Sequence, residues 1–196
     1  MSILFSNEIL DSVKRELKNA LSSVQIITAY CKESSFMRLN NYINDEVKEK
    51  RLLVRFRMDD ILKGSTDFAI IECGIETGWQ IYIRFDLHAK TYVVDNKRGL
   101  VGSANTTNSG LNIGKNRNME IATLVDIEPK DIEKINKLFD DAILVDDALL
   151  RKLKSQIDVV GANGQQKKYS WDASIITMFN PHIDTLFSYE LPEDFK

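Results

Sequence analysis

The sequence predicts an α/β domain built on a mixed, largely parallel β-sheet flanked by helices. One observation is a pair of short apolar runs, residues 24–30 and 51–56, separated by a segment with helical periodicity. A strand, helix, strand order of this length favours parallel strands joined by a crossover. A second observation is three strand-like runs in quick succession, residues 80–84, 88–94 and 98–101, which indicates antiparallel hairpins in part of the sheet.

Helices are expected wherever apolar residues recur at helical spacing. They cover residues 6–21, 34–50, 66–77, 126–143 and 146–157. Ser6 can cap the first, Gly78 ends the third, and Pro129 suits the first turn of the fourth. We expect residues 59–63 to be irregular, and residues 120–125 to form the last strand of the sheet.

The chain divides into a main domain, residues 1–158, and a linker with an aromatic-rich C-terminal extension, residues 159–196. The linker assignment depends on the polar, glycine-bearing stretch at 161–168. The extension carries Trp171, Phe179, Phe187, Tyr189 and Phe195. These aromatic residues either pack back onto the domain or a sister subunit, or form an arm that stacks on bases or docks a partner. His182 is assigned no role.

The composition is that of an ordinary soluble globular protein, with 43% hydrophobic and 28% charged residues among 196. Its two cysteines, Cys31 and Cys73, have no paired spacing, so neither a disulfide framework nor a zinc knuckle is indicated. No run is long enough for a signal peptide or a membrane span. We therefore expect a cytoplasmic protein with no membrane partner.

The net charge of −3 at first argues against a nucleic acid partner. Its distribution along the chain changes that interpretation. From residue 84 to residue 117 there are six basic residues against two acidic ones, and much of the opposite charge lies between residues 126 and 147. This central segment is therefore suited to a polyanionic substrate.

Residues 87–95 carry the chemistry around which the chain is organised. His88 and Lys90 are two apart in a predicted strand, so their side chains project from the same face. Asp95 has the opposite parity and ends the strand at a turn, so we expect it to serve the turn or the sheet.

Gly102 and Ser103 follow the next strand and lead into residues 104–109, a polar stretch that we expect to begin a helix. A helix N-terminus favours a phosphate, and the side chains of Ser103 and Asn105 add hydrogen-bond donors there. An imidazole nucleophile, an ammonium group and uncharged donors are what in-line attack on a phosphodiester requires.

These residues resemble the signature of the phospholipase D superfamily. His88, Lys90 and Asp95 match its His-x-Lys-x4-Asp, and the stretch from Gly102 through Ser103 to Asn105 matches its Gly-Ser-x-Asn. Residues 118–120 are similar to the family's Asn-x-Glu, in which the glutamate, here Glu120, orients the histidine. The resemblance is strong over about residues 80–125 and implies a phospholipase D-like fold.

The resemblance also implies a mechanism. The family's active site uses two copies of the motif, one histidine attacking phosphorus and the other protonating the leaving oxygen, whereas this chain has one copy. We therefore expect a homodimer through the active-site face, with His88 as nucleophile and the partner's His88 as general acid. Lys90 and Asn105 would hold the phosphate oxygens with help from Ser103, and neither a metal nor another cofactor is needed.

Short single-motif members resemble the nuclease branch of the superfamily, which includes metal-independent restriction endonucleases. The first hypothesis is therefore an endonuclease acting on nucleic acid, DNA more readily than RNA. Candidate phosphate contacts are Arg57, Arg84, Lys97, Lys115 and Arg117. No helix-turn-helix or zinc finger is recognisable, so specificity could reside in a separate domain or subunit. The alternatives are a non-catalytic module that binds nucleic acid or assembles partners and, third, a phospholipase.

Overall fold

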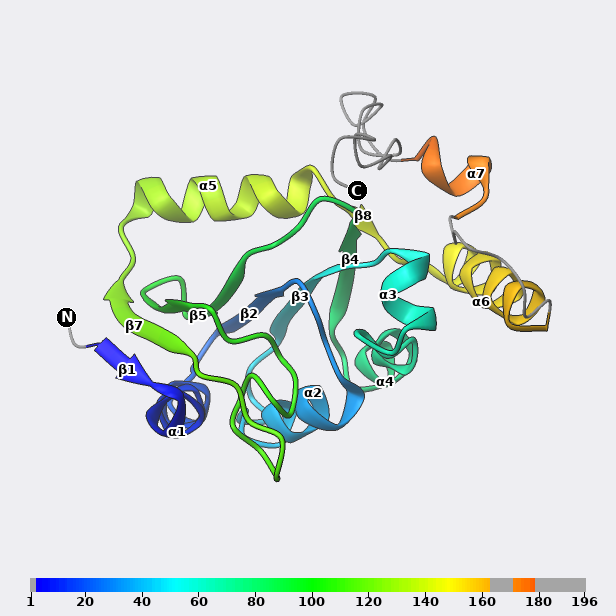
Figure 1. Ribbon diagram of the computed structural model, residues 1–196. Helices are drawn as coiled ribbons and strands as arrows, with labels where there is room; N and C mark the ends of the chain where they lie inside the picture. Colours follow the sequence, from blue (N-terminus) through cyan, green and yellow to red (C-terminus); the bar gives the residue numbers. More distant parts are fainter. Residues whose placement is uncertain (1–2, 163–170, 179–196) are drawn as a thin grey trace, which may run out of the picture.

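One eight-stranded mixed sheet organises the protein. The computed structural model describes residues 3–162 and 171–178 (Figure 1). The strands are β1 (Ile3–Phe5), β2 (Ser23–Thr28), β3 (Glu49–Arg55), β4 (Gln80–Arg84), β5 (Lys90–Val94), β6 (Arg98–Gly102), β7 (Ile121–Asp126) and β8 (Ile143–Leu144). Their order across the sheet is β1-β7-β6-β5-β2-β3-β4-β8. The α/β class and the mixed sheet are confirmed.

The expectation that this sheet is largely parallel needs correction. Only β2, β3 and β4 pair in parallel, whereas the other five of the seven strand pairings described are antiparallel. The crossover predicted between residues 24–30 and 51–56 is confirmed by the parallel pairing of β2 with β3. Strand β4, expected among the antiparallel hairpins, pairs in parallel with β3 instead and does not pair with β5. The tight β5–β6 hairpin, the return of β7 beside β6 and the pairing of β5 against β2 make most of the remaining sheet antiparallel.

Helices cover both faces of the sheet. They are α1 (Ser6–Lys18), α2 (Glu33–Asn40), α3 (Met58–Leu62), α4 (Ala69–Glu76), α5 (Pro129–Asp140), α6 (Asp147–Ala162) and α7 (Ala173–Ile176). Figure 1 shows α5 on one face and α1, α2 and α4 on the other. None of the helices in the described ranges is long and apolar enough to cross a membrane.

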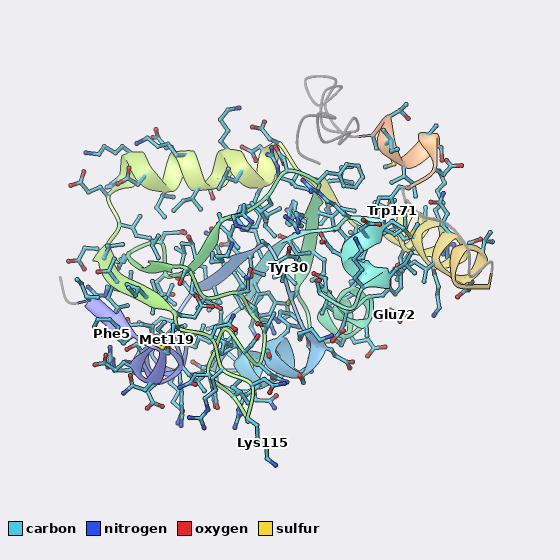
Figure 2. All side chains as sticks on the ribbon, in the orientation of Figure 1. Phe5, Tyr30, Glu72, Lys115, Met119 and Trp171 are labelled. Carbon is cyan, nitrogen blue, oxygen red and sulfur yellow. The ribbon has the colours of Figure 1, made fainter. Side chains whose placement is uncertain are left out.

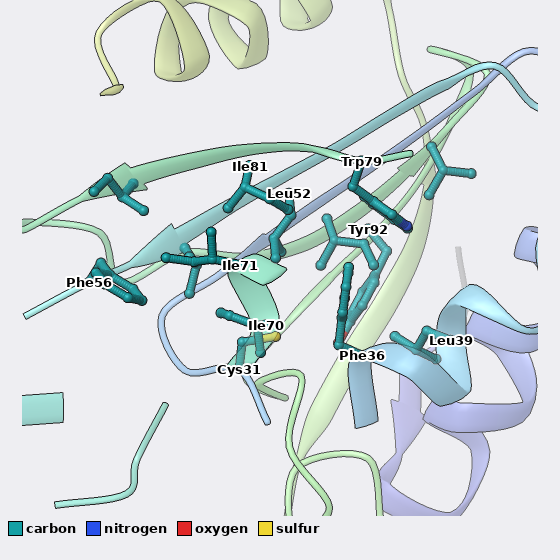
Figure 3. Close-up of a cluster of buried hydrophobic side chains, with 14 of the residues drawn as sticks. Cys31, Phe36, Leu39, Leu52, Phe56, Ile70, Ile71, Trp79, Ile81 and Tyr92 are labelled. Carbon is teal, nitrogen blue, oxygen red and sulfur yellow. The ribbon is translucent and has the colours of Figure 1, made fainter. Parts of the chain in front are cut away.

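The core alternates along the strands as the sheet geometry requires. In β2, Ile26 belongs to the large cluster under α1, α2 and α4, whereas Ile27 packs in a smaller cluster with Phe139 of α5. Within the larger cluster Phe36 meets Trp79 edge to face, with ring centroids 5.0 Å apart (Figure 3). This burial on both faces makes the central strands a rigid base for the loops that follow them.

Several expected boundaries were wrong. The helix predicted over residues 34–50 ends at Asn40, and the chain continues in turns through an asparagine-rich stretch whose side chains compete with the helical backbone. The first helix, expected to reach residue 21, ends at Lys18, and Leu21 beyond it is 80% exposed. Residues 59–63 were expected to be irregular, but residues 58–62 form the short helix α3.

The start of the C-terminal extension packs against the domain. The Trp171 ring stacks on Phe56 with centroids 5.6 Å apart, its indole nitrogen donates to the Phe56 carbonyl at 2.7 Å, and Ile175 is fully buried nearby. The expectation that aromatic residues of the extension pack onto the domain is thus confirmed for Trp171. The other aromatic residues of the extension, and His182, lie outside the described residues. Helix α6 continues past residue 158, and the division into two parts stays a prediction.

Candidate active site

The motif residues meet at one end of the sheet, which we call the His88 end. The parallel strands β2 and β3 finish there, at Thr28 and Arg55, and the antiparallel β5 starts there, with Lys90 opposite Thr28. Strand β6 finishes at Gly102, which pairs with Ala122 near the start of β7. Residues from four separate parts of the chain are therefore brought to one place, as happens at the carboxyl ends of parallel strands in α/β proteins.

His88 lies two residues before β5 rather than inside a strand, which corrects the expected strand start at residue 88. Its side chain is exposed, and the Lys90 ammonium donates to the His88 carbonyl at 2.6 Å. This contact fixes the backbone of the histidine while leaving the imidazole accessible to a substrate.

The electrostatics around His88 favour its neutral form. The Lys90 ammonium, followed by partial burial and by the guanidinium groups of Arg55 and Arg57, lowers the pKa of His88. Partial burial and Arg55 also lower the pKa of Lys90, which Glu120 raises in part. A neutral imidazole beside a cation is the combination that a nucleophile attacking a phosphate needs.

The side chain of Asp95 is engaged with the protein itself, as expected of a residue that serves the turn. Its carboxylate accepts backbone N–H groups from Leu21 at 3.0 Å, Ser22 at 2.7 Å and Ser23 at 3.0 Å, and the Ser22 hydroxyl at 2.9 Å. It lies at the far end of β5 from His88. The carboxylate therefore joins the β5–β6 turn to the segment that enters β2.

Gly102 is required by the close approach of β7. A Cβ at this position would lie 2.5 Å from the Ile121 carbonyl oxygen and 2.6 Å from the Ala122 Cβ. Nothing larger than glycine fits there without displacing β7. The glycine thereby sets the distance between the Ser103 side chain and the residues that begin β7.

The helix expected at residues 104–109 is absent, which removes the helix-dipole argument for phosphate binding. The stretch forms local turns instead. Polar side chains bind nearby backbone groups within it, and the Gly110 N–H donates to the Thr107 hydroxyl at 3.0 Å. Gly110 packs so tightly on Asn105 that a Cβ would lie 2.5 Å from its carbonyl oxygen.

Contacts with the end of β2 hold this loop in place. The Thr106 N–H donates to the Thr28 hydroxyl at 3.1 Å, and the Lys32 N–H donates to the Thr106 carbonyl at 2.9 Å. The Tyr30 N–H donates to the Asn105 side-chain oxygen at 3.0 Å. Because that N–H can only donate, the Asn105 amide nitrogen is turned away from it and is left to donate to a ligand.

Glu120 has partners other than the expected one. Its buried carboxylate accepts from the Ser103 hydroxyl and, at 3.0 Å, from the Asn118 amide nitrogen. The anticipated bond to the His88 ring is not formed within the described part of the chain. In this arrangement Glu120 positions Ser103 and Asn118 and supplies a negative charge near Lys90.

Comparison with known proteins agrees with this geometry. A family model described as "Cardiolipin synthase, PLD-like domain" matches residues 13–143. The chain belongs to this phospholipase D-like family. A search of curated protein sequences found no significant match.

Three solved structures share the fold. NucT from Helicobacter pylori is 14% identical, with a TM-score of 0.55 over 74% of this chain and 98% of its own. Nuc from Salmonella typhimurium, described as a phospholipase D family member, is 18% identical, with a TM-score of 0.55 over 74% and 96%. The phosphatidylserine synthase of Haemophilus influenzae is 15% identical, with a TM-score of 0.59 over 87% and 45%. Membership of the family supports a phosphodiesterase-type enzyme.

Two of the five basic residues predicted to contact phosphate, Arg57 and Arg84, make hydrogen bonds within the protein. Arg57 lies close enough to influence His88, but its Nε donates to the Phe85 carbonyl at 2.6 Å. Arg84 is held by both carboxylate oxygens of Asp86, each at 2.7 Å. Both guanidinium groups are therefore partly committed to the protein.

The other three cations lie in loops. Lys97 is in the β5–β6 turn, at the opposite end of β5 from His88, so its expected role has no support from position. Lys115 and Arg117 lie on the loop that connects β6 to β7, and Figure 2 shows Lys115 at its projecting tip. Of the three, Lys115 and Arg117 are the better placed for a substrate at the His88 end.

Sequence reasoning missed a buried cluster at the same end. The Arg55 guanidinium donates to both carboxylate oxygens of Asp60, at 2.8 and 2.9 Å, and to the Tyr30 hydroxyl at 2.6 Å. It also lies 4.6 Å from the Tyr30 ring centroid. The available signal was position, because Tyr30 and Arg55 stand at or just after the carboxyl ends of two predicted parallel strands.

Proposed function

We propose that this protein is a metal-independent phosphodiesterase acting on nucleic acid, specifically a restriction-type endonuclease that prefers DNA to RNA. The observation that carries the proposal is the convergence of His88, Lys90, Ser103, Asn105 and Glu120 at one end of the sheet. A non-catalytic module would have no use for an exposed imidazole whose pKa a neighbouring ammonium lowers.

The proposed reaction has two steps. A ring nitrogen of His88 bonds to phosphorus while the bond from phosphorus to the leaving oxygen breaks, and that oxygen takes a proton from the partner's His88. Water then attacks phosphorus, the partner's His88 accepts its proton, and the bond to His88 breaks. Lys90 and the Asn105 amide stabilise the phosphate oxygens in both steps.

A homodimer is part of the proposal because the chain carries one histidine motif and the reaction needs two. Apolar side chains beside Glu120 support a face for the second copy: Phe5 and its cross-strand partner Ile121 are 49% and 55% exposed, and Met119 is 90% exposed. Phe5 and Met119 lie near each other in Figure 2. Covering such a patch favours association.

The local excess of basic residues supports a polyanionic substrate, and the chain's single short motif supports the nuclease branch. Both cysteines are free thiols, which suits a reducing, cytoplasmic location. Phosphatidyl transfer is the competing function, because the family description and one structural neighbour carry the names of phospholipid synthases.

The test is cleavage of plasmid and single-stranded DNA with excess EDTA, comparing the natural chain with His88→Asn. We expect cleavage that survives the chelator and is lost in the variant, while dimerisation and DNA binding persist. Cleavage that persists in the purified variant would exclude the histidine mechanism. Turnover of a phospholipid without cleavage of either DNA would instead identify the synthase-type function.

A further inference from the structure

A polar cavity adjoins the His88 end. It has a volume of about 610 Å³ and lies between the residues that follow β2, the end of α3 and the β6–β7 loop. Asn105 and Asn118 line it, so it is continuous with the groups that surround the scissile phosphate. A phosphate alone would leave most of it empty, whereas small organic ligands occupy pockets of about 300–1,000 Å³.

The lining presents donors and acceptors together. Asn105 has its oxygen bound to the Tyr30 N–H, so its nitrogen remains to donate, whereas Asn118 gives its nitrogen to Glu120 and keeps its oxygen to accept. Asn108 accepts the Ser35 hydroxyl at 2.8 Å, which leaves its nitrogen as a donor. Phosphate oxygens need donors alone, whereas the edge of a nucleobase offers both kinds of group.

The rim of the cavity has unused polar groups. Neither Asn116 nor Lys115 makes a side-chain hydrogen bond within residues 3–162 and 171–178, and both are exposed. Lys32, by contrast, is neutralised by Asp67 and bound to the Gly64 carbonyl. The charge of Lys32 inside the cavity is thus neutralised, whereas Lys115 stands at the rim with an ammonium group that is unpaired among the described residues. A neighbouring phosphate of a nucleic acid strand would pass there.

Few of the side chains that line the cavity are apolar. Ile113 and the Tyr30 ring are the apolar groups among side chains that are otherwise amides, hydroxyls and ammonium groups. An acyl chain would meet few apolar side chains there, whereas a base and its sugar would meet hydrogen-bonding partners on several sides.

We propose that this cavity is the subsite for the nucleoside attached to the scissile phosphate, an inference that rests on the proposed nuclease function. Asn105 and Asn118 face the base or sugar from the side of the reacting group, and Asn116 closes the outer wall. Because the cavity is concave, a base must leave the stack of a duplex to enter it. The substrate therefore presents an unpaired nucleoside next to the bond that is cut.

The experiment measures binding rather than turnover, so it does not depend on catalysis. His88→Asn protein is titrated by calorimetry with thymidylyl-(3′,5′)-thymidine and with dimethyl phosphate, which share a single diester charge. We expect the dinucleotide to bind more than about tenfold more tightly. Asn116→Ala in the same background should reduce the ratio of the two affinities about fivefold, as the loss of one or two hydrogen bonds does.

The matched control is Asn41→Ala, which removes an exposed asparagine at the end of α2 and should leave the ratio unchanged. Equal affinities for the two ligands, or a ratio that Asn116→Ala does not change, would overturn the nucleoside subsite. Tighter binding of glycerophosphoglycerol than of the dinucleotide, weakened by Asn116→Ala, would also overturn it and assign the cavity to a lipid headgroup. Failure of the nuclease proposal itself would appear separately, as absence of cleavage by the natural chain.

Discussion

Replacing Asp95 tests whether the aspartate of the motif is structural. Asp95→Asn keeps the size of the side chain and tolerates the positive φ of 52° at this position, but it removes the charge and one acceptor oxygen. The carboxylate accepts three backbone N–H groups and a hydroxyl. A hydrogen bond to a charged group contributes roughly 1.5–3 kcal/mol, and water replaces part of it at this half-buried site, so we expect a loss of about 1–2 kcal/mol.

The stabilisation by Asp95 should depend on pH in a direction that its pKa fixes. Burial alone would raise the pKa of Asp95, but the N–H groups of Ser23, Ser22 and Leu21 outweigh it and lower the pKa below its ordinary value. The stabilisation is therefore complete above the ordinary aspartate pKa of about 3.9, and it is lost as the pH falls through the lower pKa of the folded protein. The difference between variant and natural chain should stay constant from about pH 7 to about pH 5 and shrink as the pH falls below about 4.

The assay is urea unfolding followed by circular dichroism, with cleavage measured on the same samples. Asp11→Asn is the matched control, because it removes the same charge from an exposed position on α1 and should change the unfolding free energy little. Asp95→Asn protein that remains folded should still cleave. Unchanged stability together with abolished cleavage would refute the structural assignment and place Asp95 in the chemistry.

The remaining predictions concern packing and charge. Gly102→Ala should destabilise the protein by about 1–3 kcal/mol in urea unfolding, because the new methyl overlaps β7; an unchanged midpoint would contradict that packing. Trp171→Ala should cost about 3–5 kcal/mol, since the ring is buried and stacked; a loss below about 1 kcal/mol would mean that the segment does not pack there. Lys90→Met should raise the pKa of His88 in an NMR titration, because the ammonium group that lowers it is gone. A pKa that falls instead would show that the ammonium group does not lower the pKa of His88. Asp60→Ala leaves a buried guanidinium without its carboxylate, so thermal unfolding should show a loss of about 3–5 kcal/mol, which an unchanged melting temperature would exclude.

The fold was most predictable where periodicity and burial act together. Residues 80–84 were predicted as a strand and form β4 with those bounds, because Ile81 and Ile83 are buried and Gly78 follows the end of the preceding helix. Strand β1, three residues at the edge of the sheet, carries too little pattern to be recognised. The parallel fraction was overestimated because pairing partners depend on loop geometry that the chain does not reveal locally.

The site was predictable through its motif and less so through its surroundings. The motif spacing placed His88, Lys90 and Asn105 at one end of the sheet, and Asp95 lies apart from them because it follows the far end of β5. The loop after Gly102 was wrongly expected to be helical, because its polar residues suit a helix start but bond to one another instead. The expected bond from Glu120 to the histidine ring depended on side-chain positions that no spacing specifies.

The most direct test of the central claim is to look for a covalent bond between His88 and the substrate. The natural chain is mixed with an oligonucleotide in excess EDTA, quenched with denaturant at high pH, digested and examined by mass spectrometry. The account predicts a nucleotide adduct on the peptide containing His88, lost on brief exposure to acid and absent from His88→Asn protein. The same mixture without EDTA is the comparison: cleavage that proceeds there with no adduct on that peptide, and that is absent in EDTA, would contradict the histidine mechanism.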